Sequence, residues 1–199
     1  MTKVKICGLS TVEAVQTVNQ IQADLAGFVF APSKRQVNFD QAQQLRQVLE
    51  PSIAAVGVFV TPDLALISRL AQTATIQIVQ LHGPQDQAVT DRIHQLGLRV
   101  TQVLHPGDTL TTTPDYVMFD GVHPGSGQRI AWQDITQMHQ PTFLAGGLTP
   151  ANVETAIERV HPDFVDVSSG VETNGIKDPT KIIEFTRRAH HAGNENNNY

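Results

Sequence analysis

Several residues capable of chemistry stand at the ends of short apolar segments. Lys5 and Cys7 alternate in the segment Val4–Cys7, and Asp120 closes the segment Tyr116–Phe119. A lysine in a short buried strand needs a partner or a function, and its charge beside Cys7 would favour the thiolate, the form in which cysteine acts as a base. A carboxylic acid and a thiol at strand ends predict general acid–base catalysis. On residue type alone, Cys7 also fits a small buried hydrophobe and Asp120 a strand-ending turn.

Other polar residues occupy comparable positions on further segments. With a period of two, Gln80 and His82 share one side of a strand, as do Asp166 and Ser168 on another. Arg35 follows a third segment, and its planar guanidinium suits a carboxylate, although a solvated loop arginine fits as well. In a closed barrel, the carboxyl ends of all these strands meet at one mouth. The pattern therefore predicts a single polar site built from several strands.

Two glycine-bearing loops follow the last two apolar segments. Glycines let the backbone approach a ligand closely, and the serines add hydroxyl donors. The loops after the seventh and eighth strands of a barrel are a common phosphate site, whereas the alternative is a pair of ordinary strand-to-helix turns. The residues expected to surround a phosphate are Gly146, Gly147, Ser168, Ser169 and Gly170.

The sequence contains no pattern that indicates a metal site or a serine nucleophile. The eight histidines show no metal-ligand spacing, and the sequence has no Ser-His-Asp elbow pattern. We expect no metal.

Strand-like and helix-like segments alternate along the chain. The strand-like segments are Val4–Cys7, Leu25–Phe30, Ile53–Val60, Ile76–Leu81, Leu98–Leu104, Tyr116–Phe119, Phe143–Ala145 and Phe164–Val167. Helix starts are indicated at Ser10 or Thr11, Asn38 or Asp40, Thr61–Asp63, Gly83-Pro84, Thr149-Pro150 and Asp178-Pro179. The threonine-rich stretch Pro106–Pro114 makes a poor helix and predicts an irregular crossover.

This alternation implies an α/β fold whose parallel strands are joined by right-handed crossovers. A closed barrel and an open doubly wound sheet both fit. No Gly-x-Gly-x-x-Gly pattern follows the first strand, as a dinucleotide-binding sheet would require. Eight units with short loops favour a compact (β/α)8 TIM barrel. We expect one domain over residues 1–192 and a polar tail over residues 193–199.

The charge and composition of the chain limit the classes of partner that it is expected to bind. A net charge of −5 argues against electrostatic wrapping of nucleic acid, but an anionic small ligand remains possible because backbone N–H groups bind phosphate without net positive charge. The single cysteine excludes an internal disulfide. With no signal-like start and no run of about 18 apolar residues, we expect a cytoplasmic protein that does not contact a membrane.

Taken together, eight motif blocks resemble those of the phosphoribosylanthranilate isomerase family, in the family's order and over nearly the whole chain. The blocks are Lys5–Leu9, Gly27–Phe30, Ser33–Arg35, Val56–Val60, Val79–Gly83, Leu144–Leu148, Val165–Glu172 and Lys177–Asp178.

The resemblance implies a small (β/α)8 barrel that carries out an Amadori rearrangement in tryptophan biosynthesis without a cofactor. The substrate would be N-(5-phosphoribosyl)anthranilate and the product 1-(2-carboxyphenylamino)-1-deoxyribulose 5-phosphate. Cys7 resembles the family's general base, Asp120 its general acid, and Arg35 the residue that holds the anthranilate carboxylate. The two glycine-bearing loops resemble the phosphate cradle. The polar residues expected to complete the substrate site are Lys5, Gln80, His82 and Asp166.

The sequence departs from the family pattern in two loops. After Asp120, Pro124 takes a position that is usually glycine, and Ala131 takes that of an aspartate. The family's usual Pro-Gly before Lys177 is replaced by Asn174–Ile176. These changes affect the ordering of the loops and leave the acid and the base in place.

Three other functions compete with this one. Histidine-pathway isomerases use paired aspartates as acid and base, which Cys7 disfavours, and indole-glycerol-phosphate synthases carry an N-terminal extension, whereas the first strand here begins almost at Lys3. A barrel without activity, kept as a binding or interaction module, is supported only by the altered loop after Asp120. The expected partner is a phosphosugar substrate, and the chain is expected to be a monomer or a homodimer.

Overall fold

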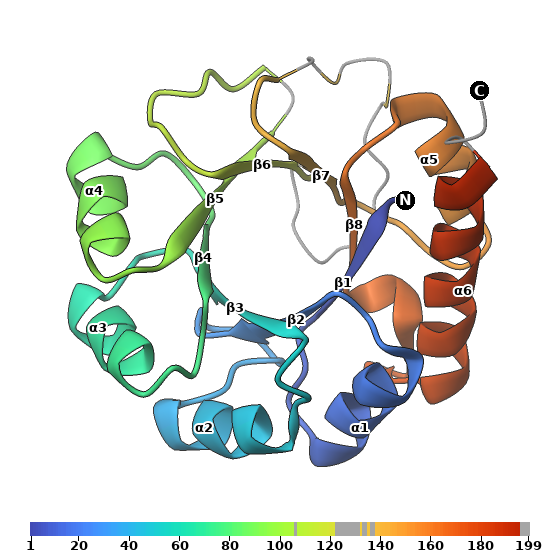
Figure 1. Ribbon diagram of the computed structural model, residues 1–199, viewed down its shortest axis with the longest axis horizontal. Helices are drawn as coiled ribbons and strands as arrows, with labels where there is room; N and C mark the ends of the chain where they lie inside the picture. The colour runs from blue at the N-terminus through green and yellow to red at the C-terminus, as the bar shows by residue number, and fades with distance from the viewer. Residues whose placement is uncertain (106, 122–131, 133–134, 136–137, 196–199) are drawn as a thin grey trace.

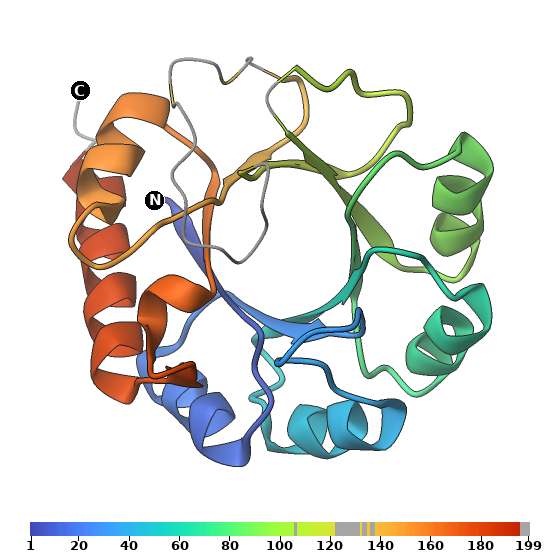
Figure 2. The same cartoon turned by 180° about the vertical axis from the view of Figure 1, so that it is seen from behind.

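Eight parallel strands close into a barrel in chain order, and β8 pairs with β1. The computed structural model describes residues 1–105, 107–121, 132, 135 and 138–195. Figures 1 and 2 show the ring of strands from its two ends. The strands are β1 (Lys3–Cys7), β2 (Leu25–Val29), β3 (Ala54–Phe59), β4 (Ile78–Leu81), β5 (Arg99–Leu104), β6 (Tyr116–Phe119), β7 (Thr142–Leu144) and β8 (Phe164–Val167). The predicted closed barrel is therefore confirmed, and the open sheet is excluded.

Helices surround the barrel (Figure 1). They are α1 (Val12–Ile21), α2 (Phe39–Val48), α3 (Leu64–Gln72), α4 (Gln87–Gln95), α5 (Val153–Val160) and α6 (Pro179–Glu195), with the 3-10 turn η2 (Ser169–Val171). Thr11, Asn38 and Asp63 cap the first three helices with their side chains, because each oxygen accepts from an N–H of the first turn. These three predicted helix starts are thus confirmed, as is a fourth at Asp178-Pro179, since α6 begins at Pro179.

Two predicted helix starts are a few residues early. Gly83 adopts a positive φ of 76° and turns the chain, so α4 begins only after Asp86. In the same way, α5 begins after Asn152 rather than at Thr149-Pro150, because residues 150–152 form a turn.

The crossover between β5 and β6 is irregular, as its threonines predict. Its described residues, 105 and 107–115, contain no helix. At the other end, α6 extends to Glu195, and residues 196–199 lie outside the described part, so the predicted polar tail stays a prediction.

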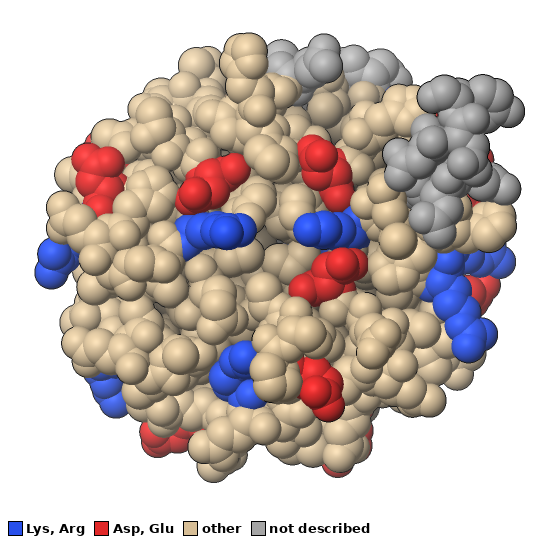
Figure 3. All heavy atoms as spheres, in the orientation of Figure 1, with Lys and Arg blue, Asp and Glu red and all other residues tan. Residues whose placement is uncertain are grey.

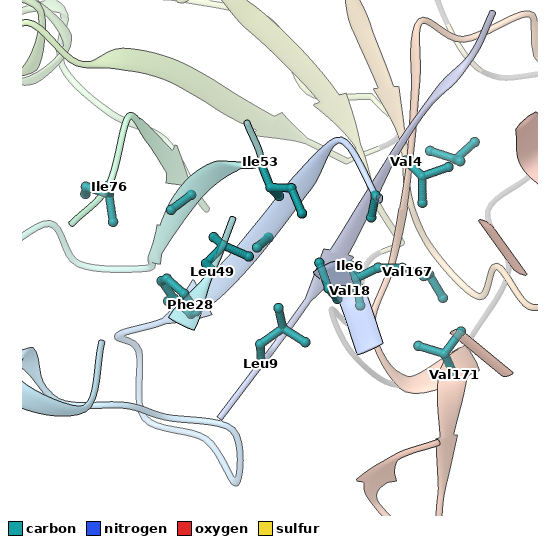
Figure 4. Packing of buried hydrophobic residues seen from close by; sticks show 14 of the residues in the cluster. Val4, Ile6, Leu9, Val18, Phe28, Leu49, Ile53, Ile76, Val167 and Val171 are labelled. Atoms are coloured by element: carbon teal, nitrogen blue, oxygen red, sulfur yellow. The ribbon is translucent and has the colours of Figure 1, made fainter. Parts of the chain in front are cut away.

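A main core lies between the strands and the helices. On β1 the fully buried Val4 and Ile6 point outward to this layer, in alternation with Lys5 and Cys7. Figure 4 shows Val18 of α1 beside Ile6, with Val167 of the neighbouring β8 on the other side of Ile6. Burying each such aliphatic side chain stabilises the fold by about 1.5–3 kcal/mol.

A second cluster fills the inside of the barrel. Phe143 and Phe164 stack with centroids 4.1 Å apart, and Tyr116 meets both rings edge-on. These aromatic residues stand at or near the starts of their strands. Because the starts are filled with aromatic rings, the inward-facing polar residues gather toward the opposite, carboxyl end of the barrel.

Candidate functional site

A buried ion pair joins the first and last strands. Lys5 and Asp166 are register partners on β1 and β8, and the Lys5 ammonium donates to Asp166 Oδ1 over 2.8 Å. The Lys5 side chain is 1% exposed and that of Asp166 10%. Burial disfavours the charged ammonium, yet Asp166 and Cys7 hold the pKa of Lys5 above its ordinary value. Lys5 is therefore a fixed positive charge inside the barrel mouth.

Cys7 ends β1 on the same inward face. Its register partner on β2 is Gly27, and a Cβ at Gly27 would lie 2.9 Å from Cys7 Sγ, so only glycine leaves room for the thiol. Burial raises the pKa of Cys7, whereas the charge of Lys5 lowers it, and the net shift is upward. The prediction that Lys5 favours the thiolate is right in sign, but desolvation outweighs it in the free protein.

Asp120 follows β6 and extends the barrel edge, since its N–H donates to the Leu104 carbonyl. Its carboxylate accepts from the Gly121 N–H over 2.7 Å, and the residue is buried. Burial and the negative charge of Asp166 raise the pKa of Asp120 to about 6. The positive charge of Lys5, across the barrel mouth, acts in the opposite direction and lowers the pKa of Asp120. Lys5 and Asp120 therefore belong to the same site. With this pKa, part of the population keeps the Asp120 carboxyl protonated near neutral pH, and in those molecules it can donate a proton.

Gln80 and His82 form a second polar group at the end of β4. Their Nε2 atoms lie 2.9 Å apart, and His82 continues the barrel edge through its N–H to Phe59 O. Burial lowers the pKa of His82 to about 4, and Lys5 and His105 add to the effect. Among the described residues, Gln80 Oε1 and His82 Nδ1 are buried without a hydrogen-bond partner. Two such orphaned atoms at the mouth are available to a polar ligand.

Arg35 lies where the sequence predicts, in the loop after β2, but it does not stand free. Its Nε and Nη2 atoms both donate to the carboxylate of Glu172, the latter over 2.9 Å. Lys177 donates to the same carboxylate over 2.9 Å and to the Ser168 carbonyl over 2.8 Å. Burial by itself would raise the pKa of Glu172, but the hydrogen bonds from Arg35 and Lys177 bring it down to about 2.

The two glycine-bearing loops touch each other. Gly146 and Gly147 have φ values of 83° and 65°, and the buried Asn152 holds their loop by donating to the Gly147 carbonyl over 3.0 Å. A Cβ on Gly170 would lie 1.8 Å from the Leu148 carbonyl oxygen. The loops after β7 and β8 therefore pack backbone to backbone.

The structure adds three residues to those predicted. Glu172 and Lys177 stand in the motif blocks but received no role, because nothing in their spacing shows that they pair with Arg35. His105 follows β5, and its Nδ1 lies 3.2 Å from the Asp120 carbonyl oxygen. A polar residue directly after a strand was the signal that could have identified it.

Two of the departures from the family pattern fall outside the described residues. Pro124 and Ala131, the departures after Asp120, lie within the undescribed residues 122–131.

Among the residues that the structure describes, no group of three or more His, Cys, Asp and Glu side chains lies close enough together to hold a metal ion. Figure 3 shows a face on which acidic and basic side chains are interspersed rather than segregated. No helix in the described ranges is long and apolar enough to span a membrane.

Comparisons with known proteins identify the family of the whole chain. The family model described as N-(5'-phosphoribosyl)anthranilate (PRA) isomerase matches residues 4–188. The chain is 45% identical over 190 residues to N-(5'-phosphoribosyl)anthranilate isomerase of Streptococcus gordonii, covering 94% of this chain and 97% of the relative. The relative from Lacticaseibacillus casei BL23 has the same name and is 46% identical over 190 residues, covering 95% of each chain.

Solved structures of phosphoribosyl anthranilate isomerases superpose on the chain over most of its length. Phosphoribosyl anthranilate isomerase from Thermus thermophilus superposes with a TM-score of 0.85 at 26% identity, covering 96% of this chain and 99% of that one. Another phosphoribosyl anthranilate isomerase, solved in complex with reduced 1-(o-carboxyphenylamino)-1-deoxyribulose 5-phosphate, has a TM-score of 0.78 at 29% identity, covering 96% and 100%. The barrel, its inward Cys7 and Asp120 and these matches over nearly the full length lead to one assignment: the chain belongs to the N-(5'-phosphoribosyl)anthranilate isomerase family.

Proposed function

We propose that this protein converts N-(5-phosphoribosyl)anthranilate into 1-(2-carboxyphenylamino)-1-deoxyribulose 5-phosphate, by general acid–base catalysis in tryptophan biosynthesis. One observation carries the mechanism. Asp120, whose pKa burial raises to about 6, shares a barrel mouth with the thiol of Cys7. An aldose-to-ketose rearrangement needs an acid and a base at adjacent atoms of one substrate, and these two groups meet that requirement.

Asp120 acts first in this mechanism. It donates its proton to the ring oxygen of the ribofuranose, the bond between that oxygen and C1 breaks, and the amine lone pair forms a C1=N iminium. Only a protonated carboxyl can do this. Burial favours the neutral acid, and the negative charge of Asp166 favours it further.

Cys7 acts second. Its thiolate removes the proton from C2, and the electron pair of that C–H bond moves toward the iminium to give an enolamine. Return of a proton to C1 and loss of the hydroxyl proton at C2 yield the ketone. The positive charge of Lys5, paired with Asp166, lowers the cost of forming the thiolate in a buried position.

Binding is assigned to groups around the reacting pair. Arg35 takes the anthranilate carboxylate, because a guanidinium matches a carboxylate in a planar, two-bond geometry. The N–H groups of the loops that contain Gly146, Gly147, Ser168, Ser169 and Gly170 take the phosphate. Gln80 and His82 offer their orphaned atoms to the polar groups of the open-chain sugar.

Complementation of a tryptophan auxotroph that lacks this isomerase tests the function. The chain should restore growth without tryptophan, and Cys7→Ala should not. If the wild-type chain fails to complement and the purified protein binds the phosphosugar product without turning over the substrate, the barrel is a binding module and the proposal is wrong.

Three expectations accompany this function. The reaction uses no cofactor, since each of its steps is a proton transfer or a bond cleavage that the acid and the base serve. The protein acts in the cytoplasm, where its phosphorylated substrate is retained. It works as a monomer or a homodimer; a solved relative from Thermotoga maritima is described as dimeric and was solved as monomers.

A further inference from the structure

Glu172 is the most highly connected side chain at the mouth for which the mechanism has no use. Its side chain is 5% exposed, and its carboxylate receives Arg35, Lys177 and, at 3.5 Å, Lys34. Lys181 donates to its backbone carbonyl over 2.8 Å. A carboxylate surrounded by cations in this way does more than neutralise one of them.

The geometry of the Arg35–Glu172 pair determines which part of the guanidinium is free. A guanidinium has two edges that can each bind a carboxylate through two N–H groups. Glu172 takes the edge formed by Nε and Nη2. Among the residues that the structure describes, the edge formed by Nη1 and the second hydrogen of Nη2 has no hydrogen-bond partner and is left for another anion. The Arg35 side chain is 13% exposed, so it has little room to turn over.

Two close contacts hold Arg35 in this orientation. A Cβ at Gly8, which has a φ of 77°, would lie 2.5 Å from Arg35 Cδ, so the arginine stem lies directly on the backbone after β1. On the other side, Lys177 ties Glu172 to the Ser168 carbonyl at the start of the loop after β8. Glu172 thereby connects the loop that carries Arg35 to the loop assigned to the phosphate.

We propose that Glu172, anchored by Lys177, is a positioning residue that presents the Nη1/Nη2 edge of Arg35 to the substrate carboxylate at a set distance from the phosphate loop. The inference rests on the proposed function. A bond network of this kind makes the substrate's two anionic ends bind to one connected unit rather than to two independent groups.

A double-mutant cycle on KM and kcat tests this role. Glu172→Gln keeps the shape of the side chain but places an amide against the Arg35 N–H groups. We expect KM to rise about 10-fold or more, with kcat within about 3-fold of wild type, because the carboxylate contact serves binding and not proton transfer. Arg35→Ala should raise KM by a similar factor. In the Arg35→Ala background, Glu172→Gln should add less than about 2-fold, since Glu172 would act through Arg35.

A structural role gives a different result. If Glu172 only holds the β9 (Glu172–Thr173) and β10 (Ile176–Lys177) hairpin, its substitution adds the same factor with or without Arg35, and the proposal is wrong. Lys34→Ala is the matched control: it removes an exposed cation from the same carboxylate and should leave KM within about 2-fold. If Glu172→Gln does not fold, Glu172→Asp, which keeps the charge but shortens the arm, takes its place in the cycle. Turnover by the wild-type chain establishes the function separately, so a failed cycle in an active enzyme overturns this inference alone.

Discussion

Two polar clusters face each other across the barrel mouth and differ in how their members are satisfied. The paired cluster consists of Lys5 on β1, Arg35 in the loop after β2, Asp166 on β8, Glu172 on β9 and Lys177 on β10. Each of its charges has an opposite charge within 2.9 Å. The open cluster, on β4 to β6, consists of Gln80, His82, His105 and Asp120. It retains orphaned atoms, and burial favours the neutral forms of its His82 and Asp120.

This difference suggests that the paired cluster positions groups and that the open cluster takes part in the chemistry. Charges buried in complementary pairs hold one geometry, because breaking a pair leaves an uncompensated charge. Gln80 and His82 keep atoms that have no partner among the described residues, so they retain the capacity to bind a ligand. The pKa of Asp120, raised to about 6, suits proton transfer near neutral pH. Cys7 stands beside the paired cluster but carries no paired charge, so it belongs by chemistry with Asp120.

The largest expected effect is the loss of either reacting group. Asp120→Asn and Cys7→Ala should each lower kcat by about 10²–10⁴-fold, the usual contribution of a general acid or base. KM should change far less, because neither group binds the carboxylate or the phosphate. Steady-state kinetics on the purified variants measures both constants. A kcat near that of wild type for either variant would contradict the mechanism.

The pH profile sharpens this assignment. The active form has protonated Asp120 and a Cys7 thiolate. Below pH 6 Asp120 stays protonated while the thiolate fraction grows, so kcat/KM should rise about tenfold per unit. Above the Asp120 pKa of about 6, loss of the acid cancels gain of the thiolate, and the profile should flatten up to the raised pKa of Cys7.

Asp120→Asn serves as the diagnostic variant for that profile. The Asn side chain does not titrate, so the residual kcat/KM should keep rising through pH 6. The substrate phosphate also titrates near pH 6, but a bend that it causes would persist in Asp120→Asn. Persistence of the bend would therefore assign it to the substrate and remove Asp120 as its source.

The second effect concerns stability in the paired cluster. Lys5→Met leaves the Asp166 carboxylate buried and unpaired, and should lower the free energy of unfolding by about 3–5 kcal/mol. The double variant Lys5→Met/Asp166→Leu removes both charges and should recover most of that loss. Urea denaturation of wild type and both variants measures the difference. If Lys5→Met is as stable as wild type, the ion pair does not hold the strands in place.

A smaller effect is expected where the two glycine-bearing loops after β7 and β8 touch. Gly170→Ala places a Cβ 1.8 Å from the Leu148 carbonyl oxygen, so the loops must separate. We expect KM to rise about 10-fold and stability to fall by about 1–3 kcal/mol, the range for overpacking. Gly97→Ala is a control for a methyl group that meets no other atom, because a Cβ there has nothing within 4 Å; unlike Gly170, Gly97 has a positive φ of 77°. It should cost some stability through strain and leave KM unchanged.

The smallest effect on stability is expected in the open cluster. Gln80→Leu/His82→Leu removes both partners of one hydrogen bond together with two orphaned atoms, and such a double replacement is nearly neutral. We expect the free energy of unfolding to change by less than about 1 kcal/mol while kcat/KM falls about 10-fold. A loss of stability like that of Lys5→Met would show that the two clusters do not differ in this respect.

Much of this fold follows from local patterns. Alternation along Val4–Cys7 already assigns Lys5 and Cys7 to one face, and the threonines before β6 already predict a crossover without a helix. Cap residues such as Thr11 and Asn38 start helices through contacts within a few residues. The starts predicted at Gly83 and Thr149 are a few residues early, because local turns at Gly83 and at residues 150–152 delay the first helical residue.

The sequence by itself determined the residue types at the strand ends, their shared face and, through motif blocks in order, the family. Only the tertiary structure decided which of these groups are paired. Glu172 meets Arg35 across 137 positions of chain and Lys5 meets Asp166 across 161. It also decided the balance at Cys7, where burial outweighs Lys5. Pairing and desolvation depend on atoms brought together by barrel closure, and no local pattern encodes which side chain reaches a given atom or how much water surrounds it.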